Sequence, residues 1–96
     1  MGDERAAGRA IIFADRAIFT PATKHSVTIA GHQTSIRIES LFWDALIRES
    51  AKRCLPINAL IAQIDAERLQ ADPAPNLASA IRLWLMAQMA ARVPDA

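Results

Sequence analysis

The sequence predicts a small, mainly α-helical domain that begins with a short β segment and assembles into an oligomer. β-Branched residues alternate along residues 24–39, and three amphipathic segments separated by prolines follow them. Hydrophobic residues make up 52% of the 96-residue chain. A lone monomer of this length buries only about two-thirds of its unfolded surface, so we expect part of the apolar surface to be covered by a second subunit.

The chain divides into an arm, residues 1–23, and one domain, residues 24–93. Apolar residues are frequent in the arm, but they follow helical spacing only loosely and leave no clear polar face. We therefore expect an ordered arm, and no role for it follows from the sequence.

The β segment changes face part-way along. Val27 and Ile29 are odd-numbered, whereas Ile36 and Ile38 are even-numbered, so a continuous strand would send the two pairs to opposite faces. Gly31 lies at the switch and can adopt the positive φ of a turn or bulge. The sequence thus predicts two short strands, or one sharply bulged strand.

Two helices joined by a short turn follow the β segment. Over residues 40–54, Trp43, Leu46 and Ile47 follow helical spacing, with charged residues on the opposite stripe. After Pro56 the spacing of the apolar residues predicts a second helix.

A third helix is predicted from Asn76 to about Val93. Asn76 is a favourable N-cap because its side chain can accept a hydrogen bond from a first-turn amide. Met86 and Met89 fall on the face that ought to be polar. We expect this helix to contact neighbours on two sides, one of them in a second subunit.

Several functional classes are disfavoured. Metalloprotease, serine-hydrolase and phosphate-loop motifs do not occur in the sequence, so we expect no enzyme and no cofactor. His25 and His32 lack the further ligands that a metal site needs. The single cysteine, Cys54, suits a reducing compartment, and no segment suits a signal peptide or a membrane span, so we expect a cytoplasmic protein.

The order of elements resembles ribbon-helix-helix proteins, and the likeness is carried by runs of sequence between Lys24 and Met86. The combined pattern is similar to a bacterial ribbon-helix-helix domain family, Arc-repressor-like and best known from alphaproteobacteria. Its runs are KHSVTIAGH, TSIRIESLFWDAL, LPINALIAQIDAER and NLASAIRLWL.

The resemblance implies an intertwined homodimer with a third helix added. One strand from each chain would pair antiparallel, and this ribbon would enter the major groove of double-stranded DNA. By parity, Gln33, Ser35 and Arg37 would face the bases. The implied dimer core comprises Ile36, Ile38, Trp43, Leu46, Ile47, Leu60, Ile61 and Ile64.

Phosphate contacts are expected at two places. Lys24 and His32 lie in the acid-free segment that includes the reading residues. The free amides of Ile57 and Asn58 begin the second helix, where the helix dipole favours an anion. Residues 16–38 carry a charge of +3 without any acid, which leaves −2 for the other 73 residues of a chain of net charge +1.

Two positions depart from the family's usual pattern. Gln33 stands where arginine is more usual, which removes a cation. Cys54 stands where glycine is common, so it must accept a left-handed backbone or change the turn.

The leading functional prediction is a dimeric DNA-binding transcriptional regulator. An alternative is a protein-interaction module that keeps the fold and binds a partner protein through Met86, Met89 and the arm. An antitoxin would combine both properties, although antitoxin tails are commonly polar, unlike this one.

Overall fold

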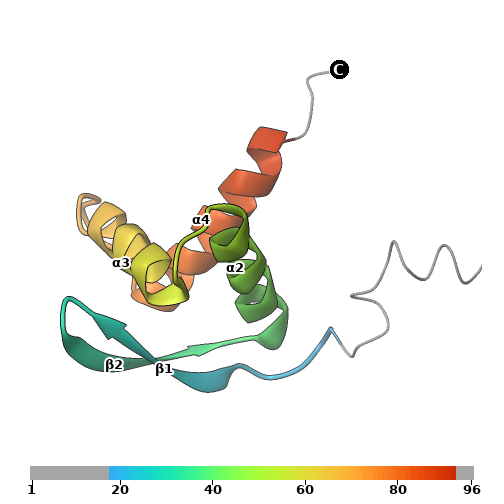
Figure 1. Ribbon diagram of the computed structural model, residues 1–96, viewed down its shortest axis with the longest axis horizontal. Coiled ribbons are helices and arrows are strands. Elements are labelled where there is room, and N and C mark those ends of the chain that lie inside the picture. The colour runs from blue at the N-terminus through green and yellow to red at the C-terminus, as the bar shows by residue number, and fades with distance from the viewer. Residues whose placement is uncertain (1–17, 93–96) are drawn as a thin grey trace, which may run out of the picture.

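The computed structural model describes residues 18–92, which form a two-stranded ribbon and three helices. The strands are β1 (Thr23–Ile29) and β2 (His32–Ile38). All three helices lie on one face of the ribbon (Figure 1): α2 (Ser40–Lys52), α3 (Ile57–Arg68) and α4 (Leu77–Arg92). The expectation of an ordered arm concerns mainly residues 1–17, which lie outside the described part.

β1 and β2 are the two strands of an antiparallel hairpin. Ile29 pairs with His32, so only Ala30 and Gly31 form the turn, with φ values of 51° and 82°. Two successive positive φ angles are typical of a type I′ turn, whose twist matches that of the strands. The prediction of two short strands is confirmed, and the hairpin brings Val27 onto the same face as the even-numbered apolar residues.

Both strands of this hairpin belong to one chain. The two-residue turn lets β1 reverse direction directly and satisfy one backbone edge of β2 within the chain. The pairing of one strand from each of two chains, which the resemblance implies, stays a prediction.

The first helix ends in a Schellman motif that uses Cys54. The amide of Leu55 donates to the carbonyl of Ser50 at 2.9 Å, and the amide of Cys54 donates to that of Ala51 at 3.1 Å. Cys54 takes a φ of 54°, so of the two alternatives that the sequence left open, it accepts the left-handed backbone. The chain is thereby turned sharply toward α3.

The next two helices begin differently. Pro56 is the N-cap of α3 and provides no side-chain hydrogen bond. Asn76 precedes α4, and its Oδ1 accepts the amide of Ser79 at 2.8 Å, as predicted from the sequence.

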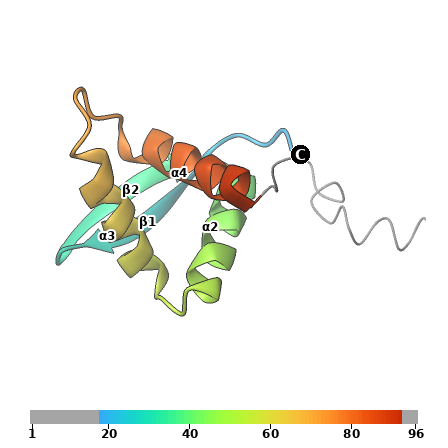
Figure 2. The ribbon, with the colours of Figure 1, turned by 90° about the horizontal axis from the view of Figure 1, so that it is seen from above.

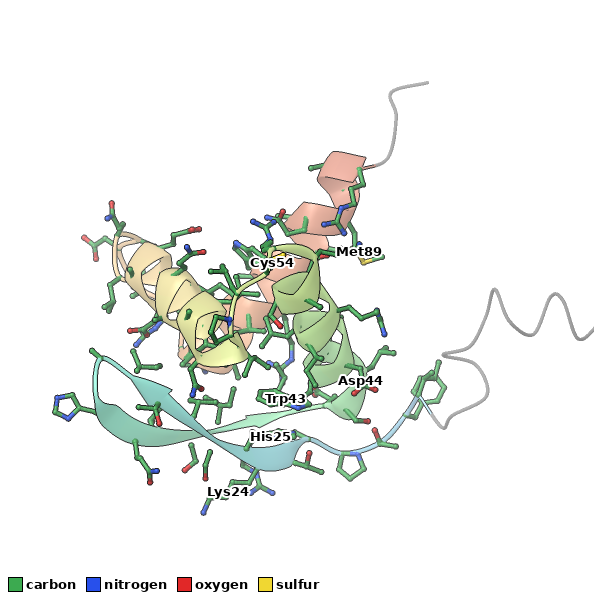
Figure 3. All side chains as sticks on the ribbon, in the orientation of Figure 1. Lys24, His25, Trp43, Asp44, Cys54 and Met89 are labelled. Carbon is green, nitrogen blue, oxygen red and sulfur yellow. The ribbon has the colours of Figure 1, made fainter. Side chains whose placement is uncertain are left out.

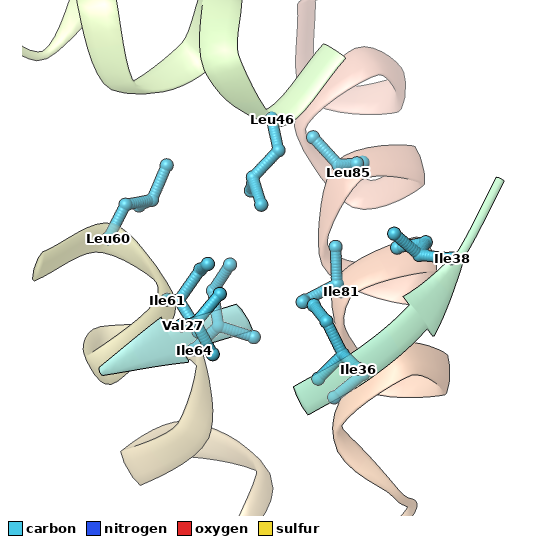
Figure 4. Close-up of a cluster of buried hydrophobic side chains, with 10 residues drawn as sticks. Val27, Ile36, Ile38, Leu46, Leu60, Ile61, Ile64, Ile81 and Leu85 are labelled. Carbon is cyan, nitrogen blue, oxygen red and sulfur yellow. The ribbon is translucent and has the colours of Figure 1, made fainter. Parts of the chain in front are cut away.

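The core lies between the inner face of the ribbon and the helices (Figure 4). It is made of aliphatic side chains from every element, which explains why the ribbon, marginal by itself, is stable here. The buried residues are Val27, Ile36, Ile38, Leu46, Leu60, Ile61, Ile64, Ala80, Ile81 and Leu85.

Most residues expected in a dimer core are thus buried within one chain. Trp43 is half-buried, and Ile47 is 44% exposed. Ile47 lies on the side of α2 that neither the ribbon nor another helix covers fully.

Two ion pairs fix α4 to α2 and to Glu39, the residue that precedes α2. Arg82 donates to Glu39 at 2.9 Å, and Arg92 donates to both carboxylate oxygens of Glu49 at 2.6 and 2.8 Å. In the view from above, α2 and α3 form a V and α4 runs across its open side (Figure 2). The third helix therefore completes the core of the single chain through Ile81.

Candidate nucleic-acid interface

The face of the ribbon that points away from the helices is polar along its whole length. In Figure 3, Lys24 projects from this outer face, opposite to the side on which the helices lie. The hairpin register pairs its six residues across the strands: Lys24 with Arg37, Ser26 with Ser35, and Thr28 with Gln33. We call these six residues the outer face.

The structure brings the predicted base-reading triplet together on this face. Gln33, Ser35 and Arg37 are all exposed, while the intervening Ile36 is buried under the helices. Alternation along a strand produces this separation because successive side chains point to opposite sides. Lys24, a predicted phosphate contact, is exposed and lies directly opposite Arg37.

Sequence reasoning missed Ser26 and Thr28 as members of the same face. Both are on β1, whose parity is opposite to that of β2, and the register of the hairpin decides where they point. The turn itself could have revealed this. With only two residues in the turn, the numbers of two paired residues always add up to an odd number, so each odd-numbered residue of β2 faces an even-numbered residue of β1.

Two acidic side chains near the ribbon, Glu39 and Asp65, are paired with arginines. Glu39 directly follows β2, and its carboxylate binds Arg82 at 2.9 Å. Its own backbone amide and then Arg82 lower the pKa of Glu39. Asp65 of α3 binds Arg68 at 2.7 Å. The positive charges of Lys24 and Arg37 are therefore not offset by an acid on the outer face.

The start of α3 adjoins the outer edge of β1. Oδ1 of Asn58 accepts the backbone amide of Thr28 at 3.3 Å. Because the side chain of Pro56 makes no cap, the first amides of α3, including those of Ile57 and Asn58, are not satisfied by it. Ile57 itself is half-buried and packs against the core.

His32 lies apart from the outer face. It pairs with Ile29, on the side of the ribbon that faces the helices, and is exposed beside the turn. With Thr34 it lines a groove of about 660 Å³ between β2 and the facing ends of α3 and α4. Its role as a phosphate contact stays a prediction.

The inner face also carries an aromatic stack. The ring of His25 lies over that of Trp43 at 4.0 Å between centroids, with 13° between the planes. In Figure 3 the two side chains lie between β1 and α2. This contact anchors β1 to the first helix, and Trp43 is not available on the outer face to stack on bases.

An antiparallel two-stranded ribbon with polar side chains on its outer face has the width of the DNA major groove. Arginine can donate twice to guanine, glutamine can pair with adenine, and lysine suits phosphate. Within residues 18–92, no cluster of three metal-ligating side chains occurs, and no described helix is long and apolar enough to span a membrane.

A second surface of interest lies on α4. Leu83, Met86 and Met89 are 60–65% exposed and follow one another at three-residue spacing along the helix. Ile81 and Leu85 are buried on the neighbouring side of the helix. Met89 lies one turn after Leu85 and lines the same hollow, so the apolar stripe adjoins the core at that end.

The fold defines a small protein of the β-ribbon class, with a polar ribbon carried on a helical core. The sequence profile described as Ribbon-helix-helix domain matches residues 22–89, and the chain belongs to that family. Members of the family are generally DNA-binding transcription regulators, typically dimeric and non-enzymatic. No curated protein and no solved structure gives a significant match.

Proposed function

We propose that this protein is a dimeric transcriptional regulator that reads the DNA major groove with the outer face of its ribbon. The observation that carries the proposal is the outer face itself: six exposed or half-exposed polar residues, two of them cationic and none acidic. An ordinary structural hairpin would not need an outer face free of acids.

The residues divide into two kinds of contact. Arg37 and Gln33 have side chains that recognise guanine and adenine, and Ser35 between them accepts either base. Lys24 and the first amides of α3, at Ile57 and Asn58, would hold phosphates, which position the protein without reading sequence.

The test is fluorescence anisotropy on a duplex from the protein's own promoter and on a scrambled duplex. Arg37→Ala should weaken binding to the promoter duplex by about 1–3 kcal/mol and reduce the preference over the scrambled one. Lys52→Ala is the matched control. It also removes one cation, but Lys52 lies at the end of α2 that points away from the ribbon (Figure 1).

If Arg37→Ala and Lys52→Ala lower the affinity for the promoter duplex equally, Arg37 contributes only net charge, which would contradict base reading. Binding that is unchanged by Arg37→Ala would show that the outer face is not the DNA interface.

A protein-interaction module is the second candidate, because Leu83, Met86 and Met89 leave a continuous apolar stripe on α4. Methionine suits surfaces that bind other helices or peptides, since its side chain adapts to the partner's shape. In this case the ribbon fold would be the support and α4 the contact surface.

The double variant Met86→Glu and Met89→Glu separates the two candidates. Loss of a stoichiometric co-purifying partner, with DNA binding retained, would support a contact surface on α4. Failure to find any partner for the wild-type protein would leave the DNA-binding function alone.

A further inference from the structure

The apolar stripe on α4 is long enough to contact another helix. Leu83, Met86 and Met89 are 60–65% exposed and, at about 1.5 Å per residue, they span roughly 9 Å or nearly two turns. Ala87 and Ala90 are exposed beside them, and α4 contains no acidic residue. Methionine side chains adapt to the shape of a partner, so this face suits the apolar side of an amphipathic helix.

A hollow lies between α2 and α4 at the Met89 end of the stripe. Its volume is about 160 Å³, and Ala45, Leu85 and Met89 form its apolar part. A cavity of about 150 Å³ can hold a benzene-sized group, so the hollow has room for one large apolar side chain. In Figure 3, Met89 lies at the end of the molecule away from Lys24 and the ribbon.

The other residues that line the hollow make it positively charged. Lys52 and Arg92 have side chains that are 58% and 45% exposed, and Arg48 is exposed as well. Glu49 is the one acid among the described residues of the lining. It is 5% exposed and accepts hydrogen bonds from Arg92 at 2.6 and 2.8 Å. Three cations and one carboxylate leave the lining with a net charge of +2.

We propose that the apolar stripe and the hollow together bind an acidic amphipathic helix of a partner protein. The apolar side of that helix would cover the stripe and place one side chain in the hollow, while its carboxylates would meet Arg48 and Lys52. The proposal rests on the protein-interaction function above, for which it supplies the chemistry of the partner. It does not depend on DNA binding by the ribbon.

Charge selects this partner over segments of the same chain. Two copies of the surface would bring two hollows of charge +2 toward each other, and like charges across an interface are unfavourable. Residues 1–17 contain three acidic residues and three arginines, so the arm offers no net negative charge. A helix with an excess of carboxylates is the occupant that matches both the apolar and the cationic part of the surface.

Two synthetic helical peptides of equal length test the proposal. Both carry leucine along one helix face, and the remaining positions are mainly glutamate in one peptide and lysine in the other. The full chain is labelled at its methionine methyl groups. Because it has three methionines, Met86 and Met89 give two of the three NMR signals. The glutamate peptide should shift both signals, and the lysine peptide should shift neither at the same concentration.

Variants of the protein locate the contact. Lys52→Ala should weaken binding of the glutamate peptide about threefold, because an exposed ion pair is lost. Arg37→Ala is the matched control, since it removes one cation from the ribbon and should leave this affinity unchanged. Met89→Glu should weaken binding more than about tenfold by placing a carboxylate at the hollow. Leu69→Glu should not, although Leu69 at the end of α3 is equally 60% exposed.

Equal binding of the two peptides, or equal losses for Lys52→Ala and Arg37→Ala, would overturn the acidic partner. Methionine signals that neither peptide shifts would overturn docking on α4. Signals that change when the protein alone is diluted would show that a second copy covers the stripe, which also contradicts the proposal. If Met86→Glu with Met89→Glu loses a co-purifying partner while the two peptides bind alike, the interaction module stands and the acidic helix fails.

Discussion

Lys24 and Arg37 lie directly opposite each other on the two strands of the ribbon, and both side chains project from its outer face. Two cations in neighbouring positions repel each other in the free protein. DNA binding would relieve this repulsion, since phosphates and base edges supply the compensating negative charge.

Replacement of Lys24 by alanine should therefore weaken binding to the promoter and scrambled duplexes by similar factors. Each phosphate contact contributes about 0.9 to the slope of log affinity against log salt concentration, so a dimer should lose about 2. Anisotropy titrations between about 50 and 200 mM salt measure the slope. An unchanged slope would mean that Lys24 does not touch phosphate.

The turn of the ribbon can be improved. Ala30 adopts a φ of 51°, which is costly for alanine and well tolerated by asparagine. Ala30→Asn should raise the free energy of unfolding by about 1 kcal/mol in urea denaturation at fixed protein concentration. Ala30→Val, which is β-branched, should lower it. If asparagine destabilises the protein, the turn differs from the one described.

Cys54 is strained for the same reason at the end of α2, with a φ of 54°. Cys54→Gly should stabilise the protein by about 1 kcal/mol, whereas Cys54→Ala keeps the strained backbone and should change little. Thermal unfolding of the three proteins checks the difference. Equal stability of the glycine and alanine variants would show that the backbone there is not strained.

Glu49 should make the protein sensitive to acid. Its carboxylate is 7% exposed, and hydrogen bonds from Arg92 lower its pKa from 4.5 although burial acts in the opposite direction. Because the folded pKa lies below the unfolded one, this stabilisation is complete above pH 4.5 and is lost as the pH falls through the lowered folded pKa.

Glu49→Gln should cost about 1–3 kcal/mol at pH 7 and flatten the dependence of stability on pH below that point. Glu67→Gln, on the exposed surface of α3, is the control. It should change neither the stability at pH 7 nor the dependence of stability on pH. Urea denaturation between pH 3 and pH 7 provides the measurement. If Glu49→Gln loses stability at low pH as steeply as the wild type, carboxylates other than Glu49 cause the acid sensitivity.

Two isoleucines, Ile38 and Ile47, should differ sharply in how much their replacement by alanine lowers the free energy of unfolding. Ile38 is fully buried, so Ile38→Ala should cost about 2–5 kcal/mol. Ile47 is 44% exposed, and Ile47→Ala should cost much less in folding of one chain. A large, concentration-dependent loss for Ile47→Ala would instead show that a second subunit buries it.

Many elements of this fold could be predicted from the sequence. The prolines bounded the helices, Asn76 marked the start of α4, and the change of parity around Gly31 divided the strand in two. These signals are local, because backbone geometry at a cap or a turn depends on a few neighbouring residues.

Contacts between distant elements were not readable in this way. The stack of His25 on Trp43 and the bonds from Arg82 to Glu39 and from Arg92 to Glu49 join residues 18 or 43 positions apart. Many arginines and acids could pair equally well by charge, and only the packing of the helices selects among them.

The side chains of β2 that share a face can be identified along the chain, since the alternation of a strand is fixed by its backbone. That β1 supplies the other half of that face, and that Asn58 accepts the outward amide of Thr28 on β1, is visible only in the folded chain. The reason is that register and edge occupancy depend on how the hairpin meets α3, and no residue determines that contact alone.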